Sequence, residues 1–287
     1  MIEQACEQHP QLSVRHLCEV LEVNRSWYYQ RPREGEAQDS DVELRDTIER
    51  VVLDFAGYGY RRVTKALQRE GMLVNHKRVL RIMREESLLC HLKRQFVHTT
   101  DSHHRYQTYP NLLHAKTLTA PDQAWVADLT YIRLPKTFVY LASLLDAYSR
   151  KCIGWKLSNR IDTKLALGAL ESALATREIK EGLLHHSDRG VQYASTAYVD
   201  RLKSVGIQVS MSAQGNPYDN AKAESFFKTL KREEVYLKRY ENLEEAQANI
   251  GTFIEEVYNT KRLHSSLGYV PPCEFEMHYA LAHRTSL

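Results

Sequence analysis

Apolar residues near the start of the chain recur at helical spacing. They occupy positions i, i+3, i+4 and i+7 at Val14, Leu17, Cys18 and Leu21. This spacing predicts a helix that breaks near residue 23, followed by a short aromatic helix that is stopped by Pro32. The polar stretch at 31–41 then predicts a linker.

A second helical block reaches residue 98. The pattern predicts a helix near 41–55, then two helices separated by a turn at Gly71, the second of them N-capped by Asn75. Two helices joined in this way, with the second one basic, are typical of a helix-turn-helix whose second helix enters the major groove of DNA. A plain helical hairpin has the same pattern, and the basic charge favours the DNA-binding interpretation.

After residue 123 the pattern changes to short β-rich runs. The runs at 124–134, 137–149 and 151–158 are joined by short turns, which predicts an antiparallel meander. A helix at 162–179 is expected to carry Leu167, Leu170 and Leu174 on one side. The remaining elements are a strand at 182–188, a helix near 195–205 and a strand at 207–212. This alternation predicts a mixed α/β sheet that helices cover on both faces.

These changes of pattern predict five regions. They are an N-terminal helical, helix-turn-helix-like segment (1–35), a helix-turn-helix DNA-binding domain (41–98), a linker (99–123), an α/β core (124–238) and a C-terminal helical extension (239–287).

Positive charge is concentrated in one part of the chain. Between Tyr58 and Arg105 there are eleven Lys or Arg and four acidic residues, so the local charge is 11 − 4 = +7 in a chain with a net charge of +3. Such a segment favours a polyanionic partner, although a solvated helix face would have the same composition. The candidate DNA contacts in it are Arg61, Arg62, Lys77, Arg78 and Arg81.

The sequence indicates neither a membrane anchor nor a disulfide framework. Its longest apolar run is interrupted by Asp146 and falls short of the roughly 20 residues that span a bilayer. The N-terminal stretch lacks a signal-peptide pattern, so we expect a cytoplasmic protein without a membrane partner. The five scattered cysteines include no CxxC pair, which favours reduced thiols over disulfides or a cysteine zinc site.

Two aspartates occupy positions that strands disfavour. Asp128 lies inside a predicted strand, on the same face as Val126 and Ile132, where an unpaired carboxylate is costly to bury. Asp188 closes the strand at 182–188, at the carboxyl end where open α/β sheets place their sites. Taken alone, Asp188 is better explained as a turn or capping residue.

Glu224 lies in a stretch with helical spacing. At 100° per residue, Glu224 borders an apolar face and shares a stripe with Asn220, Lys228 and Lys231. The apolar face consists of Ala223, Phe226, Phe227 and Leu230. A salt-bridged surface helix would look similar, and for this helix alone it is the simpler interpretation.

Taken together, Asp128, Asp188 and Glu224 form a candidate metal-binding set. Carboxylate oxygens suit hard divalent cations such as Mg²⁺ or Mn²⁺. Two such ions about 4 Å apart can activate a nucleophilic oxygen and stabilise the leaving oxygen of a displacement at phosphorus. Lys228 and Lys231 would then hold the phosphodiester backbone of the substrate. In a chain with 36 acidic residues such triples arise by chance, so spacing alone is weak support.

Longer motifs around these acids are more specific. “WVADLTYI”, “LHHSDRGVQYAS”, “GNPYDNAKAESFFKTLKREEVY” and “YNTKRLHSSLGYVPP” occur in this order along the chain. Together they resemble the DDE transposases of bacterial insertion sequences, in particular the OrfB-type product of the IS-three family. The resemblance covers essentially the whole chain, most strongly from about 120 to 275. It implies an RNase H-like, retroviral-integrase-like α/β catalytic core with an N-terminal all-α helix-turn-helix region.

The resemblance also assigns roles by position. It implies that Asp128, Asp188 and Glu224 are the catalytic acids and bind two Mg²⁺ ions, with Mn²⁺ as a substitute. The family's basic residue seven positions after the glutamate falls on Lys231. Arg262 and His264 belong to a C-terminal family motif with a structural or DNA-contacting role. The implied activity is hydrolysis of a strand at the element's end and attack by the freed 3′-hydroxyl on another phosphodiester.

The partners that the resemblance implies are nucleic acid and protein. They are double-stranded DNA, both the terminal inverted repeats and the target, further copies of this chain in the DNA complex, and an upstream OrfA-type product or fusion. The chain itself has no sustained heptad pattern for a zipper. The expected location is the cytoplasm, in association with the nucleoid.

Two other functions fit part of the pattern. A catalytically silent, transposase-derived protein would bind DNA through its N-terminal helices, but the intact acids count against it. An RNase H-like nuclease would cut RNA hybrids without joining strands, and the basic N-terminal helices count against that.

Overall fold

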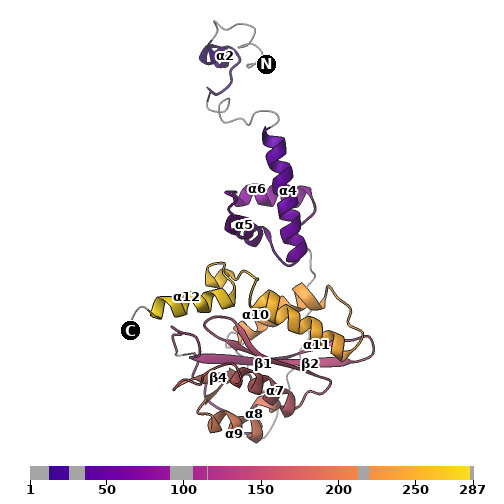
Figure 1. Cartoon of the computed structure of the whole chain (residues 1–287), viewed down its shortest axis with the longest axis vertical. Coiled ribbons are helices and arrows are strands. Elements are labelled where there is room, and N and C mark those ends of the chain that lie inside the picture. The colour runs from indigo at the N-terminus through magenta and orange to yellow at the C-terminus, as the bar shows by residue number, and fades with distance from the viewer. Residues whose placement is uncertain (1–12, 26–35, 91–105, 115, 213–219, 285–287) are drawn as a thin grey trace. The chain divides into compact units, whose positions relative to one another are not determined.

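The structure is a computed structural model that describes residues 13–25, 36–90, 106–114, 116–212 and 220–284. The chain divides into two compact units, residues 1–51 and 52–287. The second unit contains the whole sheet and the helices that pack on it (Figure 1).

The first unit begins with helix α2 (Val14–Val20). The side chain of its N-cap, Ser13, accepts a hydrogen bond from the His16 backbone N–H, and the helix buries Leu17 and Cys18 as expected. Leu21 is exposed, so its predicted place on the apolar face was wrong, because the helix ends one residue before it. The expected aromatic helix before Pro32 lies outside the described residues.

Helix α4 (Glu36–Asp54) crosses from the first unit into the second. It contains the helix that was predicted near 41–55 but begins five residues earlier. The prediction of a linker was therefore wrong from Glu36 onwards. Glu, Ala and Gln at 36–38 are good helix formers, so the polar composition of this stretch does not by itself indicate a linker.

Helices α5 (Tyr60–Arg69) and α6 (His76–Glu85) confirm the predicted pair. Gly71 adopts φ +90° in the turn between them, a conformation that costs glycine little. The Asn75 side chain accepts a hydrogen bond of 2.9 Å from the Lys77 backbone N–H and caps α6 as expected. The two helices bury Val63 and Leu67 of α5 and Val79, Ile82 and Met83 of α6.

A five-stranded sheet with the order β3-β2-β1-β4-β5 forms the centre of the second unit. The strands are β1 (Ala124–Arg133), β2 (Phe138–Asp146), β3 (Cys152–Ser158), β4 (Leu184–Ser187) and β5 (Gln208–Met211). The first three form the predicted antiparallel meander, whereas β4 runs parallel to both β1 and β5. The sheet is therefore mixed, as the alternation of strands and helices predicted.

Helices cover both faces of this sheet (Figure 1). One face carries α10 (Ala221–Leu230) and α11 (Leu243–Thr252). The other carries α7 (Thr163–Leu174), α8 (Val191–Ala194) and α9 (Thr196–Ser204). Side chains of β1 alternate between the two cores, with Val126 and Ile132 on the α10 side and Trp125 and Ala127 on the α7 side.

Helix α7 buries a different face from the one predicted. Its buried residues are Leu165, Ala166, Ala169, Leu170 and Ala173, whereas Leu167 and Leu174 are only half-buried. The small alanines allow the helix to lie close against β3, where a Cβ added at Gly154 would collide with the Ala169 carbonyl oxygen. Close backbone approach, which the leucine pattern does not reveal, therefore selects the buried face.

The C-terminal part continues the core on the α10 face. Helix α10 passes into a π-helical turn, η1 (Lys231–Val235), and α11 passes into a second one, η2 (Phe253–Tyr258). Ile250, Ile254 and Tyr258 belong to the same core cluster as Phe226 of α10. A 3-10 turn, η3 (Ser265–Leu267), and helix α12 (Pro272–Arg284) follow.

The sequence predicted neither a membrane-spanning helix nor disulfide bonds. Across the parts of the chain that the structure describes, no helix is long and apolar enough to cross a bilayer. Cys18, Cys90, Cys152 and Cys273 are free thiols, which confirms that prediction for the four described cysteines. Cys6 lies outside the described residues.

The packing of Gly154 against α7 can be tested by a single substitution. Gly154→Ala places a Cβ against the backbone of Ala169 and Ala173, so we expect the free energy of unfolding to fall by about 1–3 kcal/mol. Gly168→Ala is the matched control, because its Cβ meets only the flexible Lys156 side chain. Urea unfolding of both variants measures the difference; equal midpoints would contradict this account of the α7 packing.

Candidate active site

Asp128 lies within β1, and Asp188 directly follows β4, the parallel neighbour of β1. The β1–β4 ladder pairs Ala124 with Leu184 and Val126 with His186, a constant offset of 60 residues. Continuing this register by two residues places Asp128 opposite Asp188, and neighbouring strands lie about 4.8 Å apart. The separation of 60 residues between Asp128 and Asp188 therefore equals the offset between paired residues of β1 and β4.

Each aspartate accepts a hydrogen bond from a nearby backbone N–H, Asp128 within β1 and Asp188 directly after β4. An oxygen of Asp128 accepts a hydrogen bond of 2.8 Å from the Leu129 N–H, and an oxygen of Asp188 accepts one of 2.9 Å from the Gly190 N–H. Burial raises the pKa of Asp128 to about 8, and the negative charges of Asp188 and Glu224 act in the same direction. Asp188 and Glu224 are thus each close enough for their charge to act on Asp128.

Glu224 lies on α10 in the arrangement that the helical pattern predicted. Ala223, Phe226, Phe227 and Leu230 are buried, whereas Glu224 is exposed at the edge of that apolar face. Ahead of the helix, the buried Asn220 donates a hydrogen bond of 3.3 Å from its side-chain amide to the Ala127 carbonyl. This bond ties the start of α10 to the residue before Asp128.

Sequence reasoning placed Asn220 beside Glu224 but gave it no role. Its position just before the first residue of a predicted helix was the available signal, since Asn is common there. The structure uses the side chain to contact the sheet, and Glu224 follows one helical turn later.

Lys231 reaches the same strand as Asp128. Its ammonium nitrogen lies 4.5 Å from the ring centroid of Tyr131 on β1. Burial lowers the pKa of Lys231, and the charge of Asp128 opposes that shift. Lys228 is exposed on the stripe of Glu224. Lys228 therefore lies on the Glu224 side of α10, Lys231 begins η1 directly after that helix, and their contact with DNA stays a prediction.

The predicted metal ligands have suitable donor chemistry, and their binding of metal stays a prediction. Within the described ranges, no three His, Cys, Asp or Glu side chains are placed to hold one metal ion. The neighbouring Asp128 and Asp188 carboxylates with the exposed Glu224 nearby still offer the oxygen donors that hard divalent cations prefer. A bound cation would also offset the repulsion that raises the pKa of Asp128.

The C-terminal motif residues have structural contacts. Arg262 is 3% exposed and forms two hydrogen bonds of 2.7 Å with the Glu233 carboxylate, a bidentate ion pair. The hydroxyl of Tyr58 accepts a hydrogen bond of 2.7 Å from the Leu263 N–H. The ring of His264 packs edge-on against Tyr258. A DNA contact by Arg262 or His264 stays a prediction.

The predicted DNA contacts in the helix pair differ in exposure. Arg61, Lys77 and Arg81 are exposed, whereas Arg62 and Arg78 are half-buried. Arg81 forms an exposed ion pair of 3.1 Å with Glu85, one turn later in α6. Exposed cations on α6 fit a helix that meets the DNA backbone.

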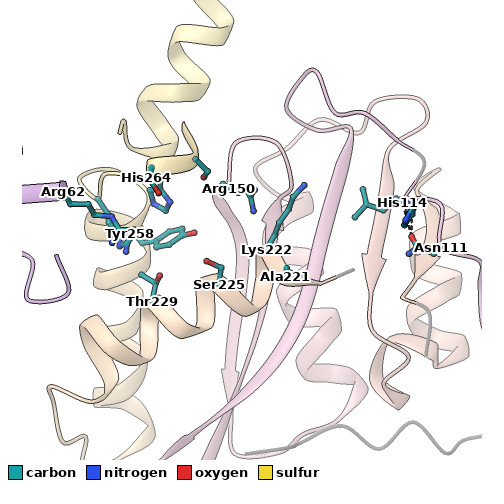
Figure 2. A pocket seen from close by; sticks show the side chains of 14 residues that line it. Arg62, Asn111, His114, Arg150, Ala221, Lys222, Ser225, Thr229, Tyr258 and His264 are labelled. Carbon is teal, nitrogen blue, oxygen red and sulfur yellow. Dashed lines mark hydrogen bonds between the residues drawn. The ribbon is translucent and has the colours of Figure 1, made fainter. Parts of the chain in front are cut away.

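A cationic cavity of about 690 Å³ adjoins α10 (Figure 2). Sequence reasoning had proposed Arg62, Arg262 and His264 from its lining as DNA contacts, but missed Arg150 and Lys222. These two residues lie in stretches far apart along the chain, so no local pattern could have joined them.

Family matches agree with this arrangement of elements. The integrase core domain family matches residues 119–217 and, in a second form, residues 205–272, and the HTH-like domain family matches residues 39–96. The chain is 37% identical over 268 residues to an insertion element IS600 protein of Shigella sonnei, covering 92% of this chain and 98% of that protein.

Two further relatives are transposases by name. One is the transposase of element IS904 from Lactococcus lactis, 39% identical with 81% of this chain and 93% of that protein covered. The other is transposase InsF of IS3 from Escherichia coli K12, 34% identical over 272 residues, covering 93% of this chain and 94% of that protein. This chain belongs to the IS3-family transposases.

The family membership confirms the predicted fold class, the RNase H-like integrase core and the transposase function. Integrase-core transposases are polynucleotidyl transferases that depend on divalent metal ions. Solved structures that resemble this transposase include a simian T-cell lymphotropic virus intasome and the catalytic core of BIV integrase. The first has a TM-score of 0.45 and 18% identity, covering 77% of this chain and 71% of that one. The second has a TM-score of 0.42 and 18% identity, covering 57% and 99%.

The Glu233–Arg262 ion pair generates a stability prediction. Glu233→Gln leaves the buried Arg262 guanidinium without its counter-charge, so we expect the free energy of unfolding to fall by about 3–5 kcal/mol. Glu256→Gln is the control, because Glu256 is exposed on η2. Chemical denaturation compares the two; a Glu233→Gln variant as stable as the control would show that the pair is not structural.

Proposed function

We propose that this transposase cuts and joins DNA strands at the ends of its insertion sequence, with Asp128, Asp188 and Glu224 as ligands of two Mg²⁺ ions. The observation that supports the proposal is the parallel pairing of β1 with β4, the strands that carry or directly precede the two aspartates, whose charges act on each other. The charge of Glu224 on α10 also acts on Asp128, which supports Glu224 as the third ligand. Mn²⁺, which accepts the same oxygen donors, would substitute.

The bound ions would activate an attacking oxygen and stabilise the leaving oxygen at phosphorus. In the first reaction a water oxygen bonds to phosphorus, the bond from phosphorus to the 3′-oxygen breaks, and that oxygen leaves as a 3′-hydroxyl. In the second reaction, this 3′-hydroxyl oxygen loses its proton and bonds to a phosphorus atom of the target. The bond from that phosphorus to the target's 3′-oxygen breaks, and that oxygen leaves as a 3′-hydroxyl. The carboxylates of this chain hold the site, and the Asn220 bond to Ala127 sets the position of α10.

We assign contacts with DNA to three places, which are the surroundings of the acids, the helix pair and the cationic cavity. We assign Lys228 and Lys231 to the substrate backbone next to the acids, because Lys228 lies on the Glu224 side of α10 and Lys231 reaches β1 from the start of η1. Arg61, Lys77, Arg78 and Arg81 of the helix pair would bind the terminal repeats. Arg62 and His264 line the cationic cavity, and Arg262 supports it through Glu233.

The wider assembly follows from the reaction. Joining element ends to a target requires two DNA ends in one complex, so we propose that copies of this chain assemble on DNA. An upstream OrfA-type product or fusion would add further DNA binding. Because the substrate is chromosomal DNA, we place the protein in the cytoplasm at the nucleoid. The regions that we propose as functional parts are the helix pair at 41–98 and the core at 124–238.

Removing any one acid should abolish the chemistry. We expect Asp128→Asn, Asp188→Asn and Glu224→Gln each to lose strand cleavage and joining on element-end DNA with Mg²⁺, by at least about 100-fold. DNA affinity, measured by fluorescence anisotropy without metal, should stay the same. Asp200→Asn is the control, since Asp200 is exposed on α9, across the sheet. Full activity in any of the three variants would sink the assignment, and an inactive wild type would favour a silent DNA-binding protein.

Charge reversal in α6 should weaken DNA binding. Arg78→Glu combined with Arg81→Glu removes two cations from the proposed recognition helix, so we expect the DNA affinity to fall. The slope of log affinity against log salt concentration should become shallower by about 0.9 for each phosphate that the helix no longer neutralises. The control is Lys164→Glu with Lys180→Glu, which makes the same change at exposed positions at and beyond α7. Unchanged affinity at low salt would show that α6 serves another purpose.

A further inference from the structure

The cavity beside α10 is lined by basic side chains and, among the described residues, by no acidic ones. Its walls come from α10, the turn after β2, the C-terminal segment around Tyr258 to Ser266, residue 62 of α5 and residues 111–114 (Figure 2). Among the described residues, four cationic side chains line it, Arg62, Arg150, Lys222 and Arg262, and no acidic side chain does. Glu233 pairs with Arg262, which leaves three cations without an acid in the lining.

Arg150 and Lys222 are half-buried and face this cavity without an ion pair. Within the described part of the chain, neither side chain forms a hydrogen bond or salt bridge to another residue. The acid whose charge reaches both is Asp146, and its oxygens already accept three backbone hydrogen bonds, from Asp122, Tyr148 and Ser149. Among the described residues, no acid therefore pairs with either cation.

Arg62 adds an unsatisfied donor to the same lining. Its buried Nε has no hydrogen-bond partner in the described ranges, which costs free energy unless a bound group accepts from it. Burial and the neighbouring positive charge of Arg262 lower the pKa of Arg62. Like charges packed together with an orphaned donor favour an anion with several acceptor oxygens.

The cavity also adjoins the candidate active site along one helix. Lys222, Ser225 and Thr229 line it from α10, at about 100–160° around the helix from Glu224. The side of Asn220, Glu224, Lys228 and Lys231 lies next to this stripe, and the apolar face occupies the remainder of the helix. A strand that passes along the exposed edge of α10 would meet both stripes.

We propose that this cavity binds a backbone phosphate of the DNA strand that flanks the reacting phosphodiester, with Arg150, Lys222 and Arg62 as donors. The hydroxyls of Ser225 and Thr229 supply further donors on the same wall. The inference rests on the proposed function, since it takes DNA as the substrate, but it concerns binding alone. The site contains none of the three acids and takes only Arg62 from the helix pair, so its proposed binding needs no metal ion.

The test compares the affinity of full-length variants for a fluorescent element-end duplex in EDTA. We expect Arg150→Gln with Lys222→Gln to weaken binding at low salt about tenfold or more and to reduce the salt slope by about 1. Arg150→Lys with Lys222→Arg keeps both charges and should bind within about threefold of wild type. The control Lys164→Gln with Lys180→Gln removes the same charge at and beyond α7 and should bind like wild type.

The outcomes separate the two proposals. Wild-type affinity and slope in Arg150→Gln with Lys222→Gln, confirmed as folded by its thermal melt, would overturn the phosphate site. So would an equal loss in Arg150→Lys with Lys222→Arg, because it would reveal a structural role. Normal binding together with lost cleavage in Asp128→Asn would leave the proposed function intact. Cleavage by Asp128→Asn would instead overturn the proposed function and not the cavity.

Discussion

The burial of the Asp128 carboxylate within β1, next to the charge of Asp188 directly after β4, is the constraint on which the site depends. The parallel register makes Asp128 and Asp188 neighbours, and partial burial makes their charges costly. A fold keeps such an arrangement only where the rest of the structure fixes it. Here the meander fixes β1 from one side, β4 fixes it from the other, and Asn220 ties α10 to it.

The same constraint explains how the surrounding charges are distributed. Lys231 lies over Tyr131 on the strand of Asp128, so a positive charge stands beside the acids. On an adjacent side of α10, Lys222 lines a separate cavity, whose wall is held by the buried pair of Glu233 and Arg262. One helix thus carries Glu224 on one side and part of a basic cavity on the next, and the proposed DNA substrate needs both a reaction centre and points of attachment.

Much of the fold could be predicted from sequence because its signals are local. The strand alternation, the Gly71 turn and the Asn75 cap each depend on a few neighbouring residues. The apolar face of α10 followed from helical spacing in the same way. Where the signal was compositional it failed: the polar residues from Glu36 were taken for a linker, although they favour a helix.

Interactions between distant parts of the chain could not be predicted. Gly154 and Ala169 select the buried face of α7 by close approach, which leucine spacing does not show. The pairing of Glu233 with Arg262 and the meeting of Arg150 with Lys222 join residues that are far apart in sequence. For the candidate site, the motifs named the three acids, whereas the strand register supplied the reason why two of them meet.

The most direct test of this account is the position of metal in a complex with element-end DNA. Crystals grown with Mn²⁺ and a duplex that lacks the attacking 3′-hydroxyl would be measured at the manganese absorption edge. We predict anomalous peaks beside both Asp128 and Asp188, with the Glu224 carboxylate turned in to complete the ligand set. Full metal occupancy elsewhere, with no peak between the two aspartates, would contradict it.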